Sequence, residues 1–230
     1  MDAKKPATGR SSASSISNTL RVCETFLSLS GESTRQGRPA WFIRLGGCNL
    51  RCAWCDTSYA WAEGEPRRIS ELADEAAASG AELAVVTGGE PLLQRGVNLL
   101  ISALDERGLT ILVETNGTQF LGDLDPVAIR IVDVKPPSAE AGEPFLMRNL
   151  DHVRSQDELK FPVADRQDFD FALDFVTRHR LGERCALLLS PVAGRVDPAE
   201  VAEWMLEAGA GFRLQLQLHK ILWGEDVKGR

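Results

Sequence analysis

The sequence predicts an α/β fold in which a parallel sheet of about six strands curls into a partial, incomplete β/α barrel. Two observations predict it. Short apolar runs alternate with helical patterns from Arg21 onward, and strands that alternate with helices pair in parallel through right-handed crossovers. Polar residues also gather where predicted strands end, at Cys48, Thr87, Glu114 and Asp133, as at the catalytic rim of an α/β barrel.

Apolar runs that end at glycine, proline or polar residues predict the strands. The strand that starts at residue 40 ends at the glycines of a cysteine-rich loop, and the next ends in the Gly-rich turn of "VVTGGEP". The predicted strands cover residues 21–29, 40–47, 81–91, 109–117, 129–137, 183–192 and 212–220.

Apolar residues at helical spacing predict the helices between these strands. Ser70 is the expected N-cap of the first helix, and Gly80 its stop. The predicted helices cover residues 70–80, 92–108, 167–180 and 197–209, and residues 151–165 are interpreted as a helix or a loop. Residues 1–20 are expected to be a disordered tail and residues 21–230 a single domain.

Composition limits the possible function classes. The formal net charge of −7 argues against a direct nucleic-acid binder, because such proteins display a basic face. The apolar runs are shorter than the roughly 20 residues that cross a bilayer, so no membrane span is expected. The first residues lack the apolar core of a secretory signal, and a cytoplasmic location is expected. A small-molecule substrate is therefore favoured.

Three of the five cysteines, Cys48, Cys52 and Cys55, have the spacing C-x3-C-x2-C. A structural zinc site normally has four Cys or His ligands, and this loop offers three cysteines. An iron–sulfur cluster fits better, because thiolates are its usual ligands. Three thiolates leave one iron of a 4Fe-4S cluster without a protein ligand, and an open position is typical of a catalytic metal site.

The cysteine spacing, with Trp54 just before the last cysteine, resembles the signature of the radical S-adenosylmethionine enzymes. The resemblance implies that S-adenosylmethionine chelates the open iron. One electron from the cluster then gives a 5′-deoxyadenosyl radical that abstracts a substrate hydrogen. Gly88, Gly89 and Glu90 are similar to the superfamily's GGE motif, which binds the cofactor's amino group. Alone, Gly-Gly-Glu after a strand is equally consistent with an ordinary turn.

Longer segments resemble one family within this group, the 7-carboxy-7-deazaguanine synthases, over about Arg21 to Gly224. The segments are Glu24 to Trp61 together with "TGGEPLLQ", "ETNGT", "VDVKPPS", "ELKFPV", "LSPV" and "QLQLHKILWG". The resemblance implies a carbon–nitrogen lyase of queuosine biosynthesis. It would convert 6-carboxy-5,6,7,8-tetrahydropterin to 7-carboxy-7-deazaguanine by hydrogen abstraction, ring contraction and ammonia loss. It also implies Mg²⁺, a homodimer, and flavodoxin or ferredoxin as reductant.

The resemblance also assigns residues. Cys48, Cys52 and Cys55 would ligate the cluster and the Thr57 hydroxyl a magnesium ion. The substrate-binding residues would be Leu29, Ser30, Gly31, Glu32, Arg44, Thr87 and His219. The cofactor-binding residues would be Trp54, Gly88, Gly89, Glu90, Asp133, Lys135, Ser138, Ser190, Pro191 and Val192. No side chain is expected to be catalytic, because the radical is generated on the cofactor.

Elementary chemistry supports two of these assignments. The Arg44 guanidinium can bind the pterin carboxylate through two parallel hydrogen bonds, and Glu32 can accept from the N–H groups of the pyrimidine edge. Local sequence alone favours a surface salt bridge for Arg44 and a solvated Glu32. The chain departs from the family pattern S-x-Q-G-E-G in "SLSGES", where Ser30 replaces Gln and Ser33 replaces Gly.

Two other functions are consistent with the cysteine triad. One is an activase of the same superfamily, which makes a glycyl radical in a partner protein and consumes S-adenosylmethionine. The other is a non-enzymatic iron–sulfur or zinc module. The "CDT" and "LHK" segments favour the synthase.

Overall fold

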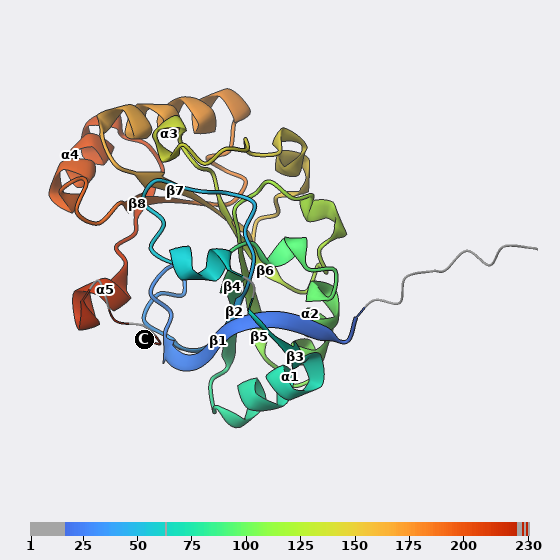
Figure 1. The fold of residues 1–230 in the computed structure, drawn as a ribbon. Helices are drawn as coiled ribbons and strands as arrows, with labels where there is room; N and C mark the ends of the chain where they lie inside the picture. Colours follow the sequence, from blue (N-terminus) through green and yellow to red (C-terminus); the bar gives the residue numbers. More distant parts are fainter. Residues whose placement is uncertain (1–16, 63, 225–226, 228, 230) are drawn as a thin grey trace, which may run out of the picture.

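One nine-stranded sheet organises the computed structural model, which describes residues 17–62, 64–224, 227 and 229 (Figure 1). The strands lie in the order β3-β1-β2-β4-β5-β6-β7-β8-β9. Their bounds are β1 (Thr19–Leu29), β2 (Pro39–Leu45), β3 (Glu65–Arg68), β4 (Leu83–Gly88), β5 (Thr110–Thr115), β6 (Ile129–Asp133), β7 (Glu158–Val163), β8 (Ala186–Pro191) and β9 (Arg213–Leu214).

The long run of the sheet is parallel and open, as expected for an incomplete barrel. Strands β2 and β4 through β9 pair in parallel, each with its neighbour in the order. Strand β1 instead pairs antiparallel with both β2 and β3, which corrects the expectation of a purely parallel sheet. The physical reason is the short connection from β1 to β2, because a parallel crossover needs a dozen or more residues.

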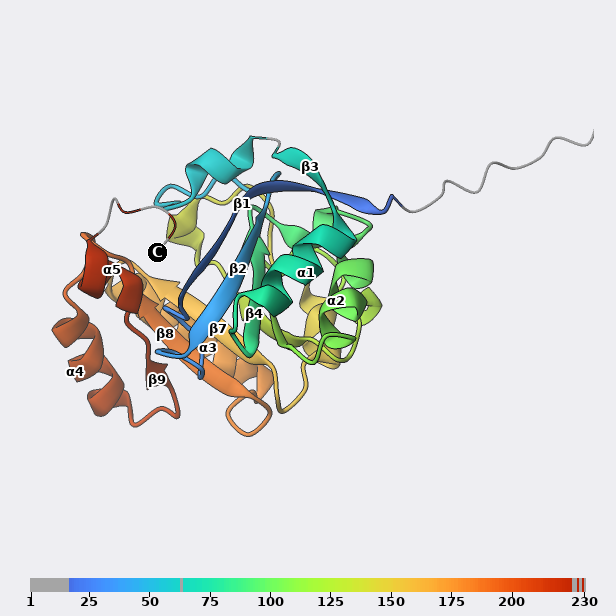
Figure 2. The ribbon, with the colours of Figure 1, turned by 90° about the horizontal axis from the view of Figure 1, so that it is seen from below.

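Helices α1 to α4 cover the outer face of this sheet (Figures 1 and 2). Helices α1 and α2 pack together beside the β4–β5 part, and α3 contacts both β7 and α4. The helix bounds are α1 (Ile69–Ala78), α2 (Val97–Asp105), α3 (Arg166–His179), α4 (Pro198–Ala208) and α5 (Leu218–Trp223), with short 3-10 helices η1 (Ser58–Trp61), η2 (Pro91–Leu93), η3 (Leu121–Asp123), η4 (Pro137–Ala139) and η5 (Met147–His152). No helix among the described residues is long and apolar enough to cross a bilayer.

Two apolar clusters join the helices to the sheet. In the first, Leu72 of α1 and Leu100 of α2 are fully buried against β1, β2, β4 and β5. In the second, Phe169 of α3 packs with Phe161 of β7. A third, smaller cluster that includes Val85 fills the opposite, inner face of the sheet. The inner face is where the strands present their side chains to the barrel interior.

Several predicted boundaries were wrong for identifiable reasons. Strand β7 falls inside the segment interpreted as a helix or loop, because its inner face carries the polar residues Glu158 and Lys160. The predicted strand at 212–220 is only β9, followed by α5. After β9 the chain leaves the sheet, and the backbone N–H of Leu218 donates to the carbonyl of Gly31 at 3.0 Å.

The helix starts also differ from those predicted. The N-cap of α1 is Arg68, not Ser70. Helix α2 starts at Val97, because η2 and Gly96 interrupt the predicted helix 92–108. Of the predicted tail, residues 1–16 lie outside the described residues, whereas Thr19 and Leu20 already belong to β1.

Candidate active site

The inner face of the sheet changes from apolar to polar toward the carboxyl ends of its strands. Alternate residues of a strand share a face, so Thr87 follows Val85 on β4, and Glu114 follows Leu112 on β5. The same two-residue alternation places one polar residue near the carboxyl end of each of the other strands that line the interior. The ring comprises Arg44 (β2), Thr87 (β4), Glu114 (β5), Asp133 (β6), Lys160 (β7) and Ser190 (β8), and all six line one cavity.

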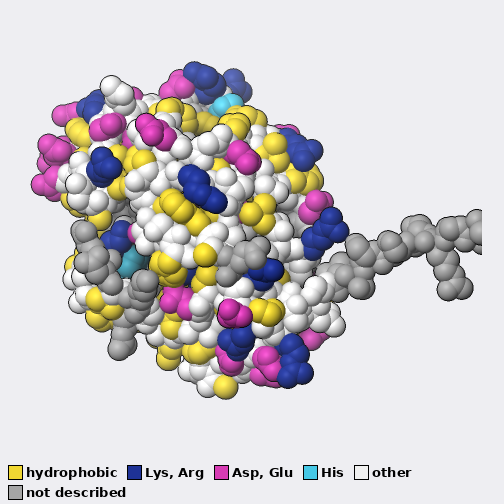
Figure 3. Space-filling view, in the orientation of Figure 1, with side chains coloured by type: hydrophobic (Ala, Val, Ile, Leu, Met, Phe, Trp, Pro, Cys, Tyr) yellow, Lys and Arg dark blue, Asp and Glu magenta, His cyan; other side chains and the backbone are white. Residues whose placement is uncertain are grey.

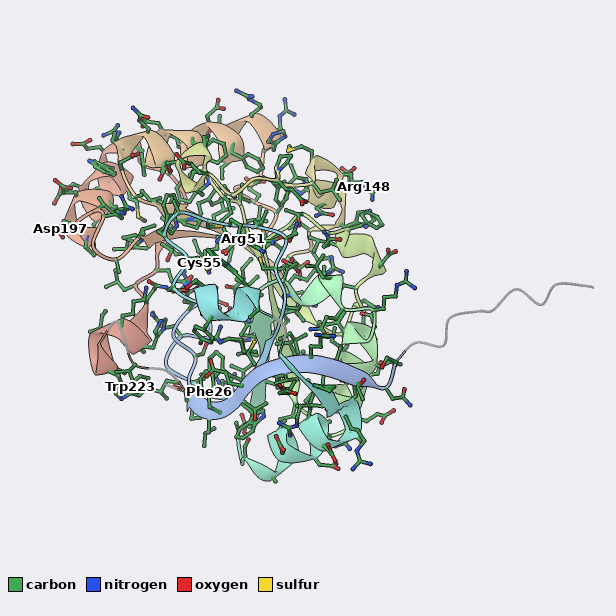
Figure 4. The ribbon with its side chains drawn as sticks, in the orientation of Figure 1. Phe26, Arg51, Cys55, Arg148, Asp197 and Trp223 are labelled. Atoms are coloured by element: carbon green, nitrogen blue, oxygen red, sulfur yellow. The ribbon has the colours of Figure 1, made fainter. Side chains whose placement is uncertain are left out.

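This cavity, about 520 Å³ in volume, lies between the strand ends and the cysteine loop. Figure 4 labels two residues that line it, Phe26 of β1 and Cys55 of the loop, whereas Arg148 and Asp197 lie at the periphery. The predicted site residues found in its lining are Leu29, Gly31, Glu32, Arg44, Cys48, Cys52, Trp54, Cys55, Thr57, Thr87, Gly88, Gly89, Asp133, Lys135, Ser190, Pro191, Val192 and His219. The fold therefore brings these residues to one place, and their individual roles stay predictions.

The cysteine loop after β2 is anchored by its backbone. The N–H of Arg51 donates to the carbonyl of Ala141 at 3.1 Å, and that of Ala53 to the carbonyl of Ala139 at 2.9 Å. The thiols of Cys48, Cys52 and Cys55 are free and half-buried. Burial raises the pKa of the Cys48 and Cys52 thiols. The loop thus presents three thiols to the cavity from a fixed backbone.

Gly89 lies directly against this loop. A Cβ at position 89 would be 2.2 Å from the carbonyl oxygen of Gly47, so only glycine fits. The N–H of Gly89 donates to the carbonyl of Leu45 at 3.1 Å, and that of Glu90 to the carbonyl of Gly47 at 2.8 Å. The two motifs singled out in the sequence therefore brace one another.

The carboxylate of Glu90 lies outside the cavity lining, which differs from the direct cofactor contact predicted for it. It is fully buried and accepts hydrogen bonds from the N–H of Leu92 (3.0 Å), the hydroxyl of Thr115 (2.8 Å) and the N–H of Asn116 (2.6 Å). Burial raises the pKa of Glu90 to about 7, although these three donors lower it. Glu90 thus ties the Gly-Gly turn to the end of β5.

Two predicted serines also lie outside the lining. The buried hydroxyl of Ser30 donates to the carbonyl of Glu32 at 2.8 Å and so shapes the loop that follows β1. The hydroxyl of Ser138 donates to the carboxylate of Asp168.

Ser33, where the family usually has glycine, has a left-handed φ of 76°, and its hydroxyl accepts from the N–H of Arg35 at 3.0 Å.

A chain of alternating charges crosses the cavity. Lys160 bonds the carboxylate of Glu32 and lies 3.0 Å from Asp133, which also pairs with Lys135. Burial opposes the charge on Lys160, yet Asp133, Glu32 and Glu114 raise its pKa well above the ordinary value. Lys160 therefore stays protonated and holds the Glu32 side chain in place.

Glu114 is the other carboxyl of the polar ring. Its oxygen accepts a hydrogen bond from the Thr87 hydroxyl at 2.8 Å. Burial raises the pKa of Glu114, although Lys160 lowers it. The Thr87 hydroxyl is thereby oriented by Glu114 of the neighbouring strand β5.

The C-terminal segment closes one side of the cavity. The amide of Gln217 donates to Glu32 at 2.9 Å and to Asp56 at 3.2 Å, and Lys220 lies 3.3 Å from Asp56. Burial opposes the charge on Asp56, but Lys220 and Gln217 lower its pKa overall. His219 reaches the cavity from helix α5, not from a strand end as predicted, and burial lowers its pKa.

Comparison with known proteins identifies the family. The family model described as the Radical SAM superfamily matches residues 42–142. A 7-carboxy-7-deazaguanine synthase from Koribacter versatilis is 38% identical, with 91% of this chain and 100% of the relative covered, and one from Thermoplasma acidophilum matches to the same extent. The chain belongs to the 7-carboxy-7-deazaguanine synthase family. It is a radical S-adenosylmethionine protein, and the activase alternative is not favoured.

Solved structures agree with this family. The crystal structure of QueE from Escherichia coli has a TM-score of 0.72 and 25% identity, and covers 86% of this chain and 94% of that chain. Streptococcus suis SuiB bound to its precursor peptide has a TM-score of 0.56 at 12% identity, covering 76% of this chain and 48% of that chain, which is a likeness of fold alone.

Membership of the synthase family implies a 4Fe-4S cluster and S-adenosylmethionine, and the residues present fit both. The donor set is three free thiols on one short loop, the ligands that such clusters use. Within the described part of the chain, no three Cys, His, Asp or Glu side chains converge enough to hold a single metal ion. A cluster takes each thiolate at a separate iron, so its three ligands need not converge on one point.

Four residues that matter to the site had no assigned role in the sequence: Glu24, Asp56, Lys160 and Gln217. Asp56 adjoins Thr57 and could have been found from that position. Lys160 could have been found from the strict alternation of "ELKFPV". Gln217 reaches Glu32 across 185 positions of sequence, so no local signal marks it.

Proposed function

We propose that this chain is a 7-carboxy-7-deazaguanine synthase that converts 6-carboxy-5,6,7,8-tetrahydropterin to 7-carboxy-7-deazaguanine with release of ammonia. The observation that carries the proposal is the cavity itself. Three cysteine thiols, a Gly-Gly turn and a ring of polar strand-end residues line the same 520 Å³ space. That size suits a bicyclic substrate bound beside a larger cofactor.

When bound, the cluster and S-adenosylmethionine supply hydrogen abstraction from the substrate. The backbone of Gly88 and Gly89, next to Cys48, would bind the cofactor, together with Trp54 and Lys135. The loop at Ser190, Pro191 and Val192 would bind it from the far side of the cavity.

The chain's own residues would bind and orient the pterin. The guanidinium of Arg44 would hold the substrate carboxylate, and Glu32 would accept from the pyrimidine edge. Lys160 and Gln217 already fix the two oxygens of Glu32, so its direction is set before the substrate arrives. The C-terminal segment would exclude water from the reacting centre.

A magnesium ion would complete the site. The Thr57 hydroxyl lies 3.9 Å from the thiol of Cys55, and Thr57 and the preceding Asp56 both line the cavity. Mg²⁺ takes oxygen ligands and keeps several waters, so one hydroxyl and the substrate carboxylate suffice as partners. We also expect a homodimer, and flavodoxin or ferredoxin as reductant, from the family.

The test is anaerobic turnover. Protein with a reconstituted cluster receives 6-carboxytetrahydropterin, S-adenosylmethionine, Mg²⁺ and a reductant, and 7-carboxy-7-deazaguanine is sought by mass. Arg44→Ala should raise KM for the pterin and leave KM for S-adenosylmethionine unchanged. Arg38→Ala is the matched control, because Arg38 pairs with Glu82 at the surface, outside the cavity. No product from fully loaded wild-type protein refutes the proposal.

A further inference from the structure

A β-bulge places Glu24 on the inner face of the sheet, opposite Arg44 of the cavity lining. The pairing between β1 and β2 runs from Val22 opposite Leu45 directly to Glu24 opposite Arg44, so Cys23 is an extra residue on β1. In regular pairing Glu24 would lie opposite Ile43, which is fully buried under the outer helices. The bulge therefore moves Glu24 to the inner face.

At that position Glu24 holds two donors with one oxygen. Its Oε1 accepts from Nε of Arg44 at 2.8 Å and from the hydroxyl of Tyr59 at 2.6 Å. Tyr59 lies in η1, four residues after Cys55, so Glu24 links the cysteine loop to β2. The side chains of Glu24 and Arg44 are 21% and 15% exposed, which limits competition from water.

Aromatic rings confine the guanidinium further. It lies 5.9 Å from the centroid of Phe26 and 6.0 Å from that of Tyr59. Phe26 is itself fixed by stacking on Phe42 at 4.9 Å. Arg44 is thus held by its Nε edge and flanked by rings, and in the described structure its hydrogen bonds use Nε alone.

We propose that Glu24 is a positioning residue whose carboxylate, held by the Tyr59 hydroxyl, occupies Nε of Arg44 and leaves the two terminal Nη groups to bind the substrate carboxylate. A guanidinium can bind a carboxylate through Nε and one Nη, or through both Nη groups. Glu24 removes the first option, so the site recognises a planar carboxylate end-on. This inference rests on the proposed function of Arg44.

The test compares two ligands. Binding of 6-carboxypterin and of pterin, which lacks the carboxylate, is measured on cluster-loaded protein with S-adenosylmethionine but without reductant, so no turnover occurs. The ratio of the Kd for pterin to the Kd for 6-carboxypterin reports what the carboxylate contributes to binding. A change that merely destabilises the fold would weaken both ligands and leave this ratio unmoved.

Glu24→Ala should reduce the ratio about tenfold, the size expected for a misplaced charge-assisted bidentate pair. Glu24→Gln keeps an oxygen that can accept from both donors, and should stay within about threefold of wild type. Tyr59→Phe should give an intermediate loss. Glu82→Ala, which breaks the surface pair with Arg38, is the matched control and should leave the ratio unchanged.

Three results overturn the inference: an unchanged ratio in Glu24→Ala, an unchanged ratio in Tyr59→Phe, or an equal loss in Glu24→Gln and Glu24→Ala. If Glu24→Ala does not fold, the Glu24→Gln and Tyr59→Phe values decide it. Failure of the proposed function looks different, because wild-type protein would then not distinguish 6-carboxypterin from pterin.

Discussion

Gly89→Ala should separate the two loops that carry the cofactor motifs. The added methyl would lie 2.2 Å from the Gly47 carbonyl oxygen, so the contact must open by about 1 Å to reach ordinary van der Waals separation. That movement stretches the hydrogen bonds from Gly89 to Leu45 and from Glu90 to Gly47, at 3.1 and 2.8 Å, beyond bonding distance. Two lost bonds at about 1 kcal/mol each cost about 2 kcal/mol of the free energy of unfolding.

Two assays measure the effect. Urea unfolding of the cluster-free protein gives the change in free energy, and iron and sulfide analysis after anaerobic reconstitution gives the cluster content. Since Gly47 precedes Cys48, we expect reduced cluster content as well as reduced stability. Gly182→Ala is the matched control, because a Cβ there meets no atom within 4 Å. If Gly89→Ala matches Gly182→Ala in both assays, the bracing of the two loops is refuted.

Three further predictions follow from the site. Cys48→Ala, Cys52→Ala or Cys55→Ala should each abolish cluster and turnover together, because two thiolates do not retain the cluster; iron content and the visible thiolate-to-iron absorbance band report it, and a retained cluster contradicts it. Thr57→Ala should weaken the dependence of product formation on Mg²⁺ while S-adenosylmethionine cleavage persists, and full magnesium stimulation in this variant refutes the placement of the ion. The pKa of Glu90 is raised from 4.5 to about 7, so its contribution to the free energy of unfolding falls as pH rises from about 4.5 through 7, by up to about 3 kcal/mol. Between about pH 5 and pH 8, the free energy of unfolding should therefore fall more for wild type than for Glu90→Gln. Equal falls in the two proteins would contradict this.

The cofactor half of the site could be predicted from sequence because its residues are close together in the chain. Cys48 to Cys55 form one loop, and the Gly-Gly turn is a single strand end. Both motifs are recognisable in the sequence, and the structure places them in contact. A site whose residues are close together in the sequence can be predicted without knowledge of the tertiary structure.

Other parts of the site depend on long-range pairing, and some of their residues were missed or misplaced. Glu24 lies on the inner face, opposite Arg44, only because of a bulge that shows in the register with β2. Lys160 belongs to a strand whose inner face is polar, and such a strand lacks the continuous apolar run typical of parallel sheets. A strand was predicted over residues 212–220, yet β9 ends at Leu214 and the N–H of Leu218 donates to the carbonyl of Gly31 instead of to a strand.

The surface is consistent with a small-molecule enzyme. On the face shown in Figure 3, basic and acidic side chains are interspersed rather than gathered by sign. With the net charge of −7, this surface offers no broad basic face for a phosphate backbone on that side. Recognition is therefore expected to occur in the cavity.

The central claim is tested most directly by the stoichiometry of anaerobic turnover. Cluster-loaded protein is given 6-carboxytetrahydropterin, Mg²⁺, reductant and a limiting amount of S-adenosylmethionine, and 7-carboxy-7-deazaguanine and consumed S-adenosylmethionine are both measured. A synthase that regenerates its cofactor should form many product molecules for each S-adenosylmethionine lost. Consumption of S-adenosylmethionine without deazaguanine would contradict the proposed function.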